Sequence, residues 1–329
     1  MRMILPELET SISFTEGQIM IIEANNVVKR YKEVTALDHF GFSAQKGDII
    51  GLLGPNGSGK TTFIHCALAL LTYDKGEIKL FDRRMEPNAY DLKRRIGVVP
   101  QEVSVFDTLN VWENIDYFCG LYIDDSKLRK ERVEEALEFT ELTKYRKFLP
   151  KKLSGGLKRR LNIACGIAHK PELIFLDEPT VAVDAQSRNF ILEGIRNLNK
   201  AGATIIYTTH YLEEAESLCK KIIIMDKGKN IAEGSPEELK ERICGGEKIE
   251  ISFKNGAAEL AEELKKLPGI VRVDDYADGY LLQFLSRSGN LNSLLNFIEE
   301  WGLIYSNLYI RRSTLNEVFL ELTGKELRE

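Results

Sequence analysis

The sequence predicts an α/β protein with a parallel sheet core, followed by a smaller α+β domain. Short apolar runs typical of buried parallel strands recur at residues 49–53, 96–99, 173–176 and 204–208. Helical patterns separate these runs, and this alternation is characteristic of a parallel sheet covered by helices. After Gly245 the order becomes strand, helix, strand, strand, helix, strand. That second order predicts a ferredoxin-like split βαβ domain.

The composition is that of a soluble globular protein with room for two domains. The chain has 329 residues, of which 43% are hydrophobic and 29% charged, and its formal net charge is −5. This acidic balance gives no electrostatic footprint for nucleic acid, so we predict no nucleic-acid partner. No apolar run approaches the roughly 20 residues of a membrane-spanning helix. The five cysteines are scattered without a C-x-x-C pair, which indicates reduced, mostly buried thiols in a cytosolic protein.

The first 19 residues differ in character from the rest of the chain. They contain Pro6, Gly17 and several glutamates and lack a clear periodicity, whereas Met20 opens a strand pattern that runs to Tyr31. The glutamates also interrupt the apolar core that a signal peptide needs. We expect either a loosely held leader or a chain whose natural start is Met20.

The strongest motif follows the apolar run at residues 49–53. It matches strand, G-x-x-x-x-G-K-[ST], helix, because a helical pattern runs from residue 63 to residue 71. Glycines in such a loop let successive backbone N–H groups point at a diphosphate, with a helix amino terminus behind them. Lys60 can reach the outer phosphates, and the hydroxyl of Thr61 can bind Mg²⁺. We therefore predict a nucleoside triphosphate site made by Gly54, Pro55, Asn56, Gly57, Ser58, Gly59, Lys60, Thr61 and Thr62.

Two single residues each admit two interpretations. Tyr31 precedes the turn into a strand at residues 34–42, where an aromatic ring can stack on adenine, although it more often packs on a strand edge. Gln101 follows the apolar run at residues 96–99, at the sheet edge where ligands bind in α/β folds. Taken alone, such a glutamine is more often a solvated loop residue.

A second glycine turn opens a long helix after the helical stretch at residues 109–149. Ser154, Gly155 and Gly156 can present bare N–H groups and the positive end of a helix dipole to an anion. The alternative is that Ser154 only caps the helix. The residues by themselves leave both interpretations open.

Polar residues end two more of the predicted strands. Asp177 and Glu178 follow the apolar run at residues 173–176. An aspartate there suits a water-mediated contact with Mg²⁺, and the adjacent glutamate can orient or deprotonate water. A buried strand leads directly to these acids, which favours function over two exposed turn residues. His210 ends the strand at residues 204–209, where its imidazole can donate to a γ-phosphate.

Together these motifs resemble the ATP-binding subunits of ABC transporters over roughly residues 20–240. Three segments are similar to the family's Walker A, signature and Walker B motifs, namely Gly54–Thr61, Leu153–Gly156 and Leu173–Asp177. Four residues match the Q-loop glutamine, the catalytic carboxylate, the D-loop aspartate and the switch histidine, namely Gln101, Glu178, Asp184 and His210. The resemblance also favours adenine stacking for Tyr31.

The resemblance implies a P-loop NTPase fold of the ABC type, with a parallel sheet core, an antiparallel β subdomain and a helical subdomain. The ATP-binding domain would span residues 20–244, with the helical subdomain at about 102–165. The ferredoxin-like accessory domain would span residues 245–329. No cluster of catalytic residue types occurs in it, and we interpret it as a regulatory, dimerising or docking module.

The resemblance further implies that ATP is bound between two subunits. The loop around Lys60 in one copy would bind the phosphates, and the other copy would contribute Ser154, Gly155, Gly156 and Asp184. The implied Mg²⁺ ligands are Thr61, Gln101 and Asp177, and the implied catalytic residues are Glu178, His210, Lys60 and Gln101. The expected partners are a second nucleotide-binding subunit, most simply an identical copy, and separate transmembrane permease subunits. The chain would then lie in the cytoplasm, peripheral to the inner face of the cell membrane.

Two departures from the family pattern affect loops at the expected dimer interface. Leu157 stands where glutamine is usual in the signature, and Val181–Asp184 replaces the commoner Ser-Gly-Leu-Asp. Neither change removes a ligand of phosphate or Mg²⁺, so we expect activity. The C-terminal module resembles extensions of ABC-2 type systems, which are mostly exporters.

Two other classes of function remain as alternatives. A soluble ABC ATPase acting on ribosomes or DNA predicts tandem nucleotide domains, a long coiled coil or a basic surface, and the sequence displays none of these. A regulatory switch that binds ATP without hydrolysing it conflicts with the presence of Glu178 and His210.

Overall fold

The structure is a computed structural model. It describes residues 19–244, 247–254, 260–285, 289–311 and 314–324. The predicted leader therefore lies almost entirely outside the described residues. No helix in the described ranges combines the length and the apolar character needed to cross a bilayer.

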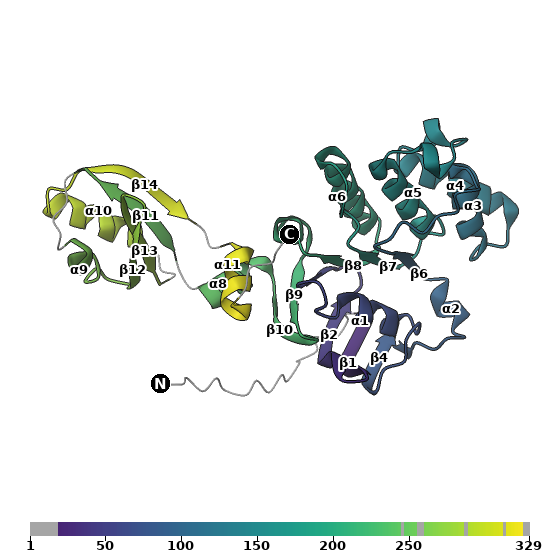
Figure 1. Cartoon of the computed structure of the whole chain (residues 1–329), viewed down its shortest axis with the longest axis horizontal. Helices are drawn as coiled ribbons and strands as arrows, with labels where there is room; N and C mark the ends of the chain where they lie inside the picture. The colour runs from purple at the N-terminus through teal and green to yellow at the C-terminus, as the bar shows by residue number, and fades with distance from the viewer. Residues whose placement is uncertain (1–18, 245–246, 255–259, 286–288, 312–313, 325–329) are drawn as a thin grey trace.

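A six-stranded sheet with the order β10-β9-β3-β8-β7-β6 forms the centre of the first domain (Figure 1). Its strands are β3 (Ile49–Leu53), β6 (Ile96–Val99), β7 (Leu173–Asp177), β8 (Thr204–Thr209), β9 (Lys221–Asp226) and β10 (Lys229–Gly234). All pairs are parallel except β9 with β10. Every residue of β3, β7 and β8 is buried, as expected for parallel strands covered on both faces.

The register of the central strands brings their carboxyl ends to one edge. Leu53 of β3 pairs with Thr209 of β8, and Asp177 of β7 pairs with Thr208 of β8. The residues that follow these strands therefore begin side by side, which is the expected position of a ligand site in an open α/β sheet.

Helices cover the two faces of this sheet. Helix α1 (Lys60–Ala67) packs on one face, and α5 (Gly155–Ile167), α6 (Ala185–Lys200) and α7 (Leu212–Leu218) pack on the other. A short helix α2 (Tyr90–Lys93) precedes β6.

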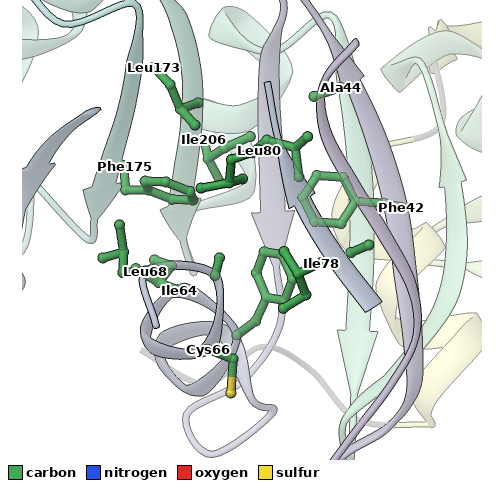
Figure 2. Packing of buried hydrophobic residues seen from close by; sticks show 14 of the residues in the cluster. Phe42, Ala44, Ile64, Cys66, Leu68, Ile78, Leu80, Leu173, Phe175 and Ile206 are labelled. Atoms are coloured by element: carbon green, nitrogen blue, oxygen red, sulfur yellow. The ribbon is translucent and has the colours of Figure 1, made fainter. Parts of the chain in front are cut away.

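A four-stranded antiparallel sheet packs on the outer side of α1. It contains β1 (Met20–Tyr31), β2 (Val34–Gln45), β4 (Lys75–Leu80) and β5 (Arg83–Arg84) in the order β2-β1-β4-β5. Phe63 of α1 is fully buried and makes edge contacts with the rings of Phe40 and Phe42 at 5.0 and 5.2 Å. Figure 2 shows Phe42 of β2 and Phe175 of β7 in the same cluster, so α1 and its loop lie between two sheets.

The helical insert has its own hydrophobic core. It contains α3 (Val111–Gly120), α4 (Ser126–Phe139), two 3₁₀ turns η1 (Thr143–Tyr145) and η2 (Pro150–Lys152), and α5 (Gly155–Ile167). The predicted helical stretch at residues 109–149 is interrupted, because Asn110 caps α3 through a reciprocal capping box with Glu113 and Asp125 caps α4. Ser235 caps α8 (Pro236–Cys244) by accepting from the N–H of Glu238.

The C-terminal part contains the predicted ferredoxin-like unit. Its elements are β11 (Lys248–Phe253), α9 (Leu260–Leu264), β12 (Ile270–Tyr276), β13 (Gly279–Phe284), α10 (Asn290–Glu300) and β14 (Tyr305–Arg311). The sheet order is β12-β13-β11-β14 and every pair is antiparallel. The unit is built around a separate hydrophobic cluster.

The last helix, α11 (Leu315–Thr323), does not pack in that cluster. It lies against α8, as Figure 1 shows, and it also contacts α7. Leu315, Val318 and Phe319 are buried in the same cluster as Ala215 of α7 and Leu239 of α8. The sequence prediction placed this helix within residues 245–329, and its apolar face is instead covered by helices that precede residue 245.

Candidate active site

The loop after β3 requires glycine at its last turn. Gly59 has a φ of 111° immediately before α1 begins at Lys60. A Cβ on Gly59 would lie 2.5 Å from the carbonyl oxygen of Ala36. Only glycine satisfies both the positive φ and this close approach. The loop thus brings the amino terminus of α1 against the end of β3.

Lys60 is held on its own loop. Its side chain is 5% exposed, and Nζ donates to the carbonyl oxygens of Gly54 and Pro55 at 2.7 and 3.2 Å. Glu178 Oε1 lies 3.6 Å from Nζ. Burial lowers the pKa of Lys60, and the charges of Glu178 and Asp177 oppose that shift. The ammonium is therefore buried at the amino terminus of α1, a kind of helix end that can bind phosphates.

The loop also contains a buried hydroxyl that no protein group satisfies. Ser58 Oγ has no hydrogen-bond partner within the described part of the chain. Buried polar atoms normally have a partner, and an orphaned one calls for an unseen water or ligand. This atom fits a loop that binds an oxygen-rich ligand.

Asp177 and Thr61 form an oxygen pair at the same edge. The hydroxyl of Thr61 donates to Asp177 Oδ2 at 2.8 Å, and Thr208 donates to Oδ1 at 2.6 Å. Hydroxyl and carboxylate oxygens are the donors that a hard cation such as Mg²⁺ prefers. The described residues contain no group of three or more His, Cys, Asp or Glu that could hold a metal alone. This donor set fits Mg²⁺, which usually binds through one or two protein ligands together with substrate phosphates.

Glu178 and His210 lie together beside Lys60. Glu178 is 4% exposed, and its Oε2 lies 3.0 Å from His210 Nδ1. The φ of Glu178 is 46°, a left-handed value that is uncommon for a residue other than glycine. The N–H of Glu178 donates to Thr208 Oγ1 at 2.9 Å. Adjacent residues can therefore direct two carboxylates to different partners, Asp177 to hydroxyls and Glu178 to Lys60 and His210.

A pocket of about 330 Å³ opens at this edge. It contains most of the predicted loop together with Gln101 and Glu178. Its lining residues are Val34, Thr35, Ala36, Asn56, Gly57, Gly59, Lys60, Thr61, Thr62, Gln101 and Glu178. A larger cleft of about 680 Å³, between α4 and the ends of α5 and α6, contains none of the predicted site residues.

Residues 34–36 were missed by the sequence argument. They form the start of β2 beside the turn after Tyr31, and only their proximity to Tyr31 could have indicated them. Tyr31 itself is 44% exposed and does not line the pocket, and Lys29 Nζ lies 5.0 Å from its ring centroid.

The loop containing Gln101 is held by the helix that Ser154 opens. Arg159 of α5 is 5% exposed and donates to the carbonyl oxygens of Pro100 and Gln101 at 3.1 and 2.7 Å. Asn162 donates to the carbonyl oxygen of Pro100 at 3.1 Å. Burial lowers the pKa of Arg159, and the charge of Asp177 opposes the shift. A basic residue on the buried side of α5 was the only sequence signal for this contact.

Ser154, Gly155, Gly156 and Asp184 form a separate group outside the pocket. Ser154 caps α5 by accepting from the N–H of Leu157 at 3.3 Å, so the capping interpretation is correct for its side chain. Ser154 and Gly155 are exposed. A Cβ on Gly156 would lie 2.2 Å from Ser187 Oγ, which leaves room only for glycine. Leu157, the departure from the family pattern, packs on the core of the helical insert.

Asp184 is committed to a helix cap. Its carboxylate accepts from the N–H of Ser187 at 2.8 Å and from the Ser187 hydroxyl at 2.9 Å. These hydrogen bonds lower the pKa of Asp184, with the backbone bond the largest cause. This cap at the start of α6 lies against the start of α5, because a Cβ on Gly156 would be 3.4 Å from Asp184 Oδ2.

The fold and the site together define a P-loop nucleoside triphosphatase with the architecture of an ABC ATP-binding cassette. Two family models match the chain: the ABC transporter family over residues 37–181, and the C-terminal domain of ATP-binding proteins like DrrA1-3 over residues 234–323. The second match includes both α8 and α11.

Individual relatives give the same assignment. The linearmycin resistance ATP-binding protein LnrL of Bacillus subtilis (strain 168) is 35% identical over 94% of this chain and its own full length. The daunorubicin resistance ATP-binding protein DrrA3 of Streptomyces coeruleorubidus is 34% identical over 93% of this chain and 97% of its own. The dimeric post-hydrolysis state of the ATP-binding cassette MJ0796 with ADP and Pi is 26% identical, with a TM-score of 0.61 over 65% of this chain and 98% of that chain.

The chain therefore belongs to the family of ABC transporter ATP-binding subunits, and it is an ATPase. These relatives do not favour the alternative of a soluble ABC ATPase without a role in transport.

Proposed function

We propose that two copies of this chain close around ATP, and that hydrolysis between them drives export through separate membrane subunits. The observation that supports this most is the separation of two anion-binding groups within one copy. The loop around Lys60 lines the pocket, whereas the exposed helix end at Ser154 and Gly155 does not. A helix amino terminus that faces solvent can bind the phosphate held by a second copy. ATP then acts as a ligand that shifts the population toward the closed dimer.

We assign the phosphates to the loop and the Mg²⁺ to the oxygen pair beside it. Lys60 would exchange the carbonyl oxygens of its loop for phosphate oxygens. Thr61, Asp177 and Gln101 would hold Mg²⁺, which neutralises charge on the phosphates when bound. The partner copy would contribute Ser154, Gly155, Gly156 and Asp184. Tyr31 would stack on adenine, with its exposed ring next to the pocket residues at the start of β2.

Glu178 is the proposed base and His210 its partner. The carboxylate would accept a hydrogen bond from the attacking water and take its proton as the oxygen bonds to the γ-phosphorus. The bond to the β-phosphate oxygen then breaks, leaving ADP and phosphate. His210 orients Glu178 through Nδ1, and its other nitrogen can donate to the γ-phosphate. The short distance between Glu178 and His210 supports this pairing.

The relatives bear on direction and location. Their names refer to linearmycin resistance, daunorubicin resistance and Nod factor export. We infer export here, with separate permease subunits and a position on the inner face of the cell membrane. We propose that residues 20–244 form the ATP-binding domain and that residues 245–329 form the accessory domain. Helix α11 is the part of the accessory domain that packs on the ATP-binding domain. The accessory domain would serve regulation, dimerisation or docking.

The test uses the Glu178→Gln variant of the purified full chain. We expect it to lose ATP turnover yet bind ATP, and to elute as a dimer with saturating Mg-ATP and as a monomer with ADP. The matched variant Glu178→Gln with Ser154→Arg should bind ATP and stay monomeric, because Ser154 lies outside the ATP pocket of its own copy. If the single variant stays monomeric with ATP bound, the proposed sandwich is wrong.

A further inference from the structure

A buried carboxylate that the proposed mechanism does not use lies behind the active site. Glu214 is on α7, four residues after His210, and is 4% exposed. Its Oε2 accepts three hydrogen bonds: from Tyr207 Oη at 2.6 Å, Thr180 Oγ1 at 2.9 Å and Thr209 Oγ1 at 3.0 Å. The three hydroxyl-bearing residues are each no more than 1% exposed. A single oxygen atom thus joins α7 to two other segments, β8 and the turn after β7.

Each partner belongs to a segment that carries a proposed active-site residue. Thr180 lies in the turn two residues after Glu178, and Thr209 immediately precedes His210. The hydroxyl of Thr209 also accepts from the N–H of Tyr211, which fixes the turn between β8 and α7. A threonine side chain from the segment of Glu178 and another from the segment of His210 therefore donate to Glu214.

The second oxygen of Glu214 faces the helix that Asp184 caps. Arg188, in the first turns of α6, places Nε 3.4 Å from Glu214 Oε1. Neither atom has a hydrogen-bond partner in the ranges that the structure describes, so the pair is ionic and loosely made. Arg188 Cζ also lies 4.4 Å from the ring centroid of Tyr211. The ring centroids of Tyr211 and His210 are 4.2 Å apart.

The chemistry of this position favours a group with two acceptor oxygens. One carboxylate oxygen of Glu214 accepts from the three hydroxyls, and the other faces the Arg188 guanidinium. An amide in the same place has one acceptor oxygen and one donor group. Either its NH₂ would face Arg188, or it would face the hydroxyls that now donate. The arrangement therefore favours a carboxylate over an amide.

We infer that Glu214 is a positioning residue, which holds the segments of Glu178 and His210 in register and joins them to α6. This inference rests on the proposed roles of Glu178 and His210. The bonds to Thr180 and Thr209 fix the catalytic pair within one copy. The contact with Arg188 connects the catalytic pair to the segment of Asp184. We assign Asp184 to the ATP that is bound by the partner copy. Glu214 itself is not among the residues that line the pocket.

The test compares Glu214→Gln with Glu213→Gln, which changes the exposed neighbour on the same helix. In Glu214→Gln we expect kcat to fall about 10- to 100-fold, as for a small misplacement of reacting groups. The Kd of ATP should stay within about twofold, because no residue of the pocket is bonded to Glu214. Glu213→Gln should leave both unchanged. Equal loss of kcat in the two variants, or a change in Kd alone, would overturn the inference.

A spectroscopic measurement separates positioning from general destabilisation. The chain has four histidines, so their ring resonances can be assigned by single substitutions. In nucleotide-free Glu214→Gln, the His210 resonances should shift while those of His39, His65 and His169 stay in place. Because this measurement needs no dimer and no turnover, it stays valid if the ATP sandwich proves wrong. An unchanged His210 spectrum would refute the positioning role.

If Glu214→Gln does not fold, a milder pair gives the same test. Thr180→Val removes one hydroxyl from Glu214 and keeps the side-chain shape, whereas Thr180→Ser keeps the hydroxyl. We expect Thr180→Val to lower kcat and to shift the His210 ring resonances. Thr180→Ser should keep both kcat and the resonances close to those of the unchanged chain. If Val and Ser behave alike, the hydrogen bond to Glu214 does not position the site.

Discussion

Helix α11 provides a direct test of how the C-terminal region is attached. Phe319 is 1% exposed and packs with Leu239 of α8 and Ala215 of α7. Replacing a buried phenylalanine with alanine typically costs about 3–5 kcal/mol. The free energy of unfolding of a domain is about 5–15 kcal/mol. Phe319→Ala therefore removes a large share of the stability of the domain to which Phe319 belongs. For a domain of 150–250 residues, we expect a fall in Tm of about 6–20 °C.

The matched control is Phe284→Ala in β13, which is 0% exposed and belongs to the ferredoxin-like cluster. Both variants lose the same atoms from a buried site. A difference between their effects on stability therefore reports which part of the chain each phenylalanine stabilises. Hydrogen exchange followed by mass spectrometry assigns each loss to a segment. Phe319→Ala should reduce the protection of α7 and α8, and Phe284→Ala that of β11 and β13. If Phe319→Ala loosens β11 and β13 and spares α7, the helix belongs to the ferredoxin-like unit and our account of the packing is wrong.

Two further predictions concern single side chains. Gly156→Ala should abolish most ATPase activity with ATP affinity retained, because its Cβ would lie 2.2 Å from Ser187 Oγ and displace the cap of Asp184. The control is Gly194→Ala in α6, whose Cβ would meet no atom nearer than 3.5 Å, and equal activity in both variants would contradict this prediction. Burial lowers the pKa of His169 from 6.5 to about 4, so it stays neutral in the fold while the unfolded chain takes up a proton. Stability should therefore be full above pH 6.5 and fall by about 3 kcal/mol as the pH drops to about 4. Denaturant titrations of His169→Gln should show a shallower acid loss, and an equally steep loss would exclude His169 as its cause.

The carboxyl edge of the sheet could be predicted from the sequence because parallel strands align their ends. Asp177 and His210 follow apolar runs that are far apart in the chain. The register places Asp177 opposite Thr208, next to the end of β8. No knowledge of side-chain packing was needed for this step, only that buried parallel strands end together. The motif after β3 likewise required only the alternation of strand, glycine loop and helix.

Contacts that depend on packing between distant elements were not predictable in the same way. Arg159 and Glu214 are charged residues within helices, and a sequence pattern assigns such residues to solvated faces. Both are buried because partners from other segments satisfy them, the carbonyl oxygen of Gln101 for one and three hydroxyls for the other. The return of α11 to α8 is a similar case, since an amphipathic helix shows that it packs but not against what.

The different partners of the buried carboxylates suggest why the site can fold without ligand and still respond to it. Asp177 is satisfied by two hydroxyls, whereas the carboxylate of Glu178 lies 3.6 Å from Lys60 Nζ and 3.0 Å from His210 Nδ1. Lys60 is shared between this carboxylate and the carbonyl oxygens of its own loop. A phosphate carries more charge than a carbonyl and competes for the same ammonium. We therefore expect ATP to draw Lys60 away from Glu178, which frees the carboxylate to accept from water only when the substrate is present.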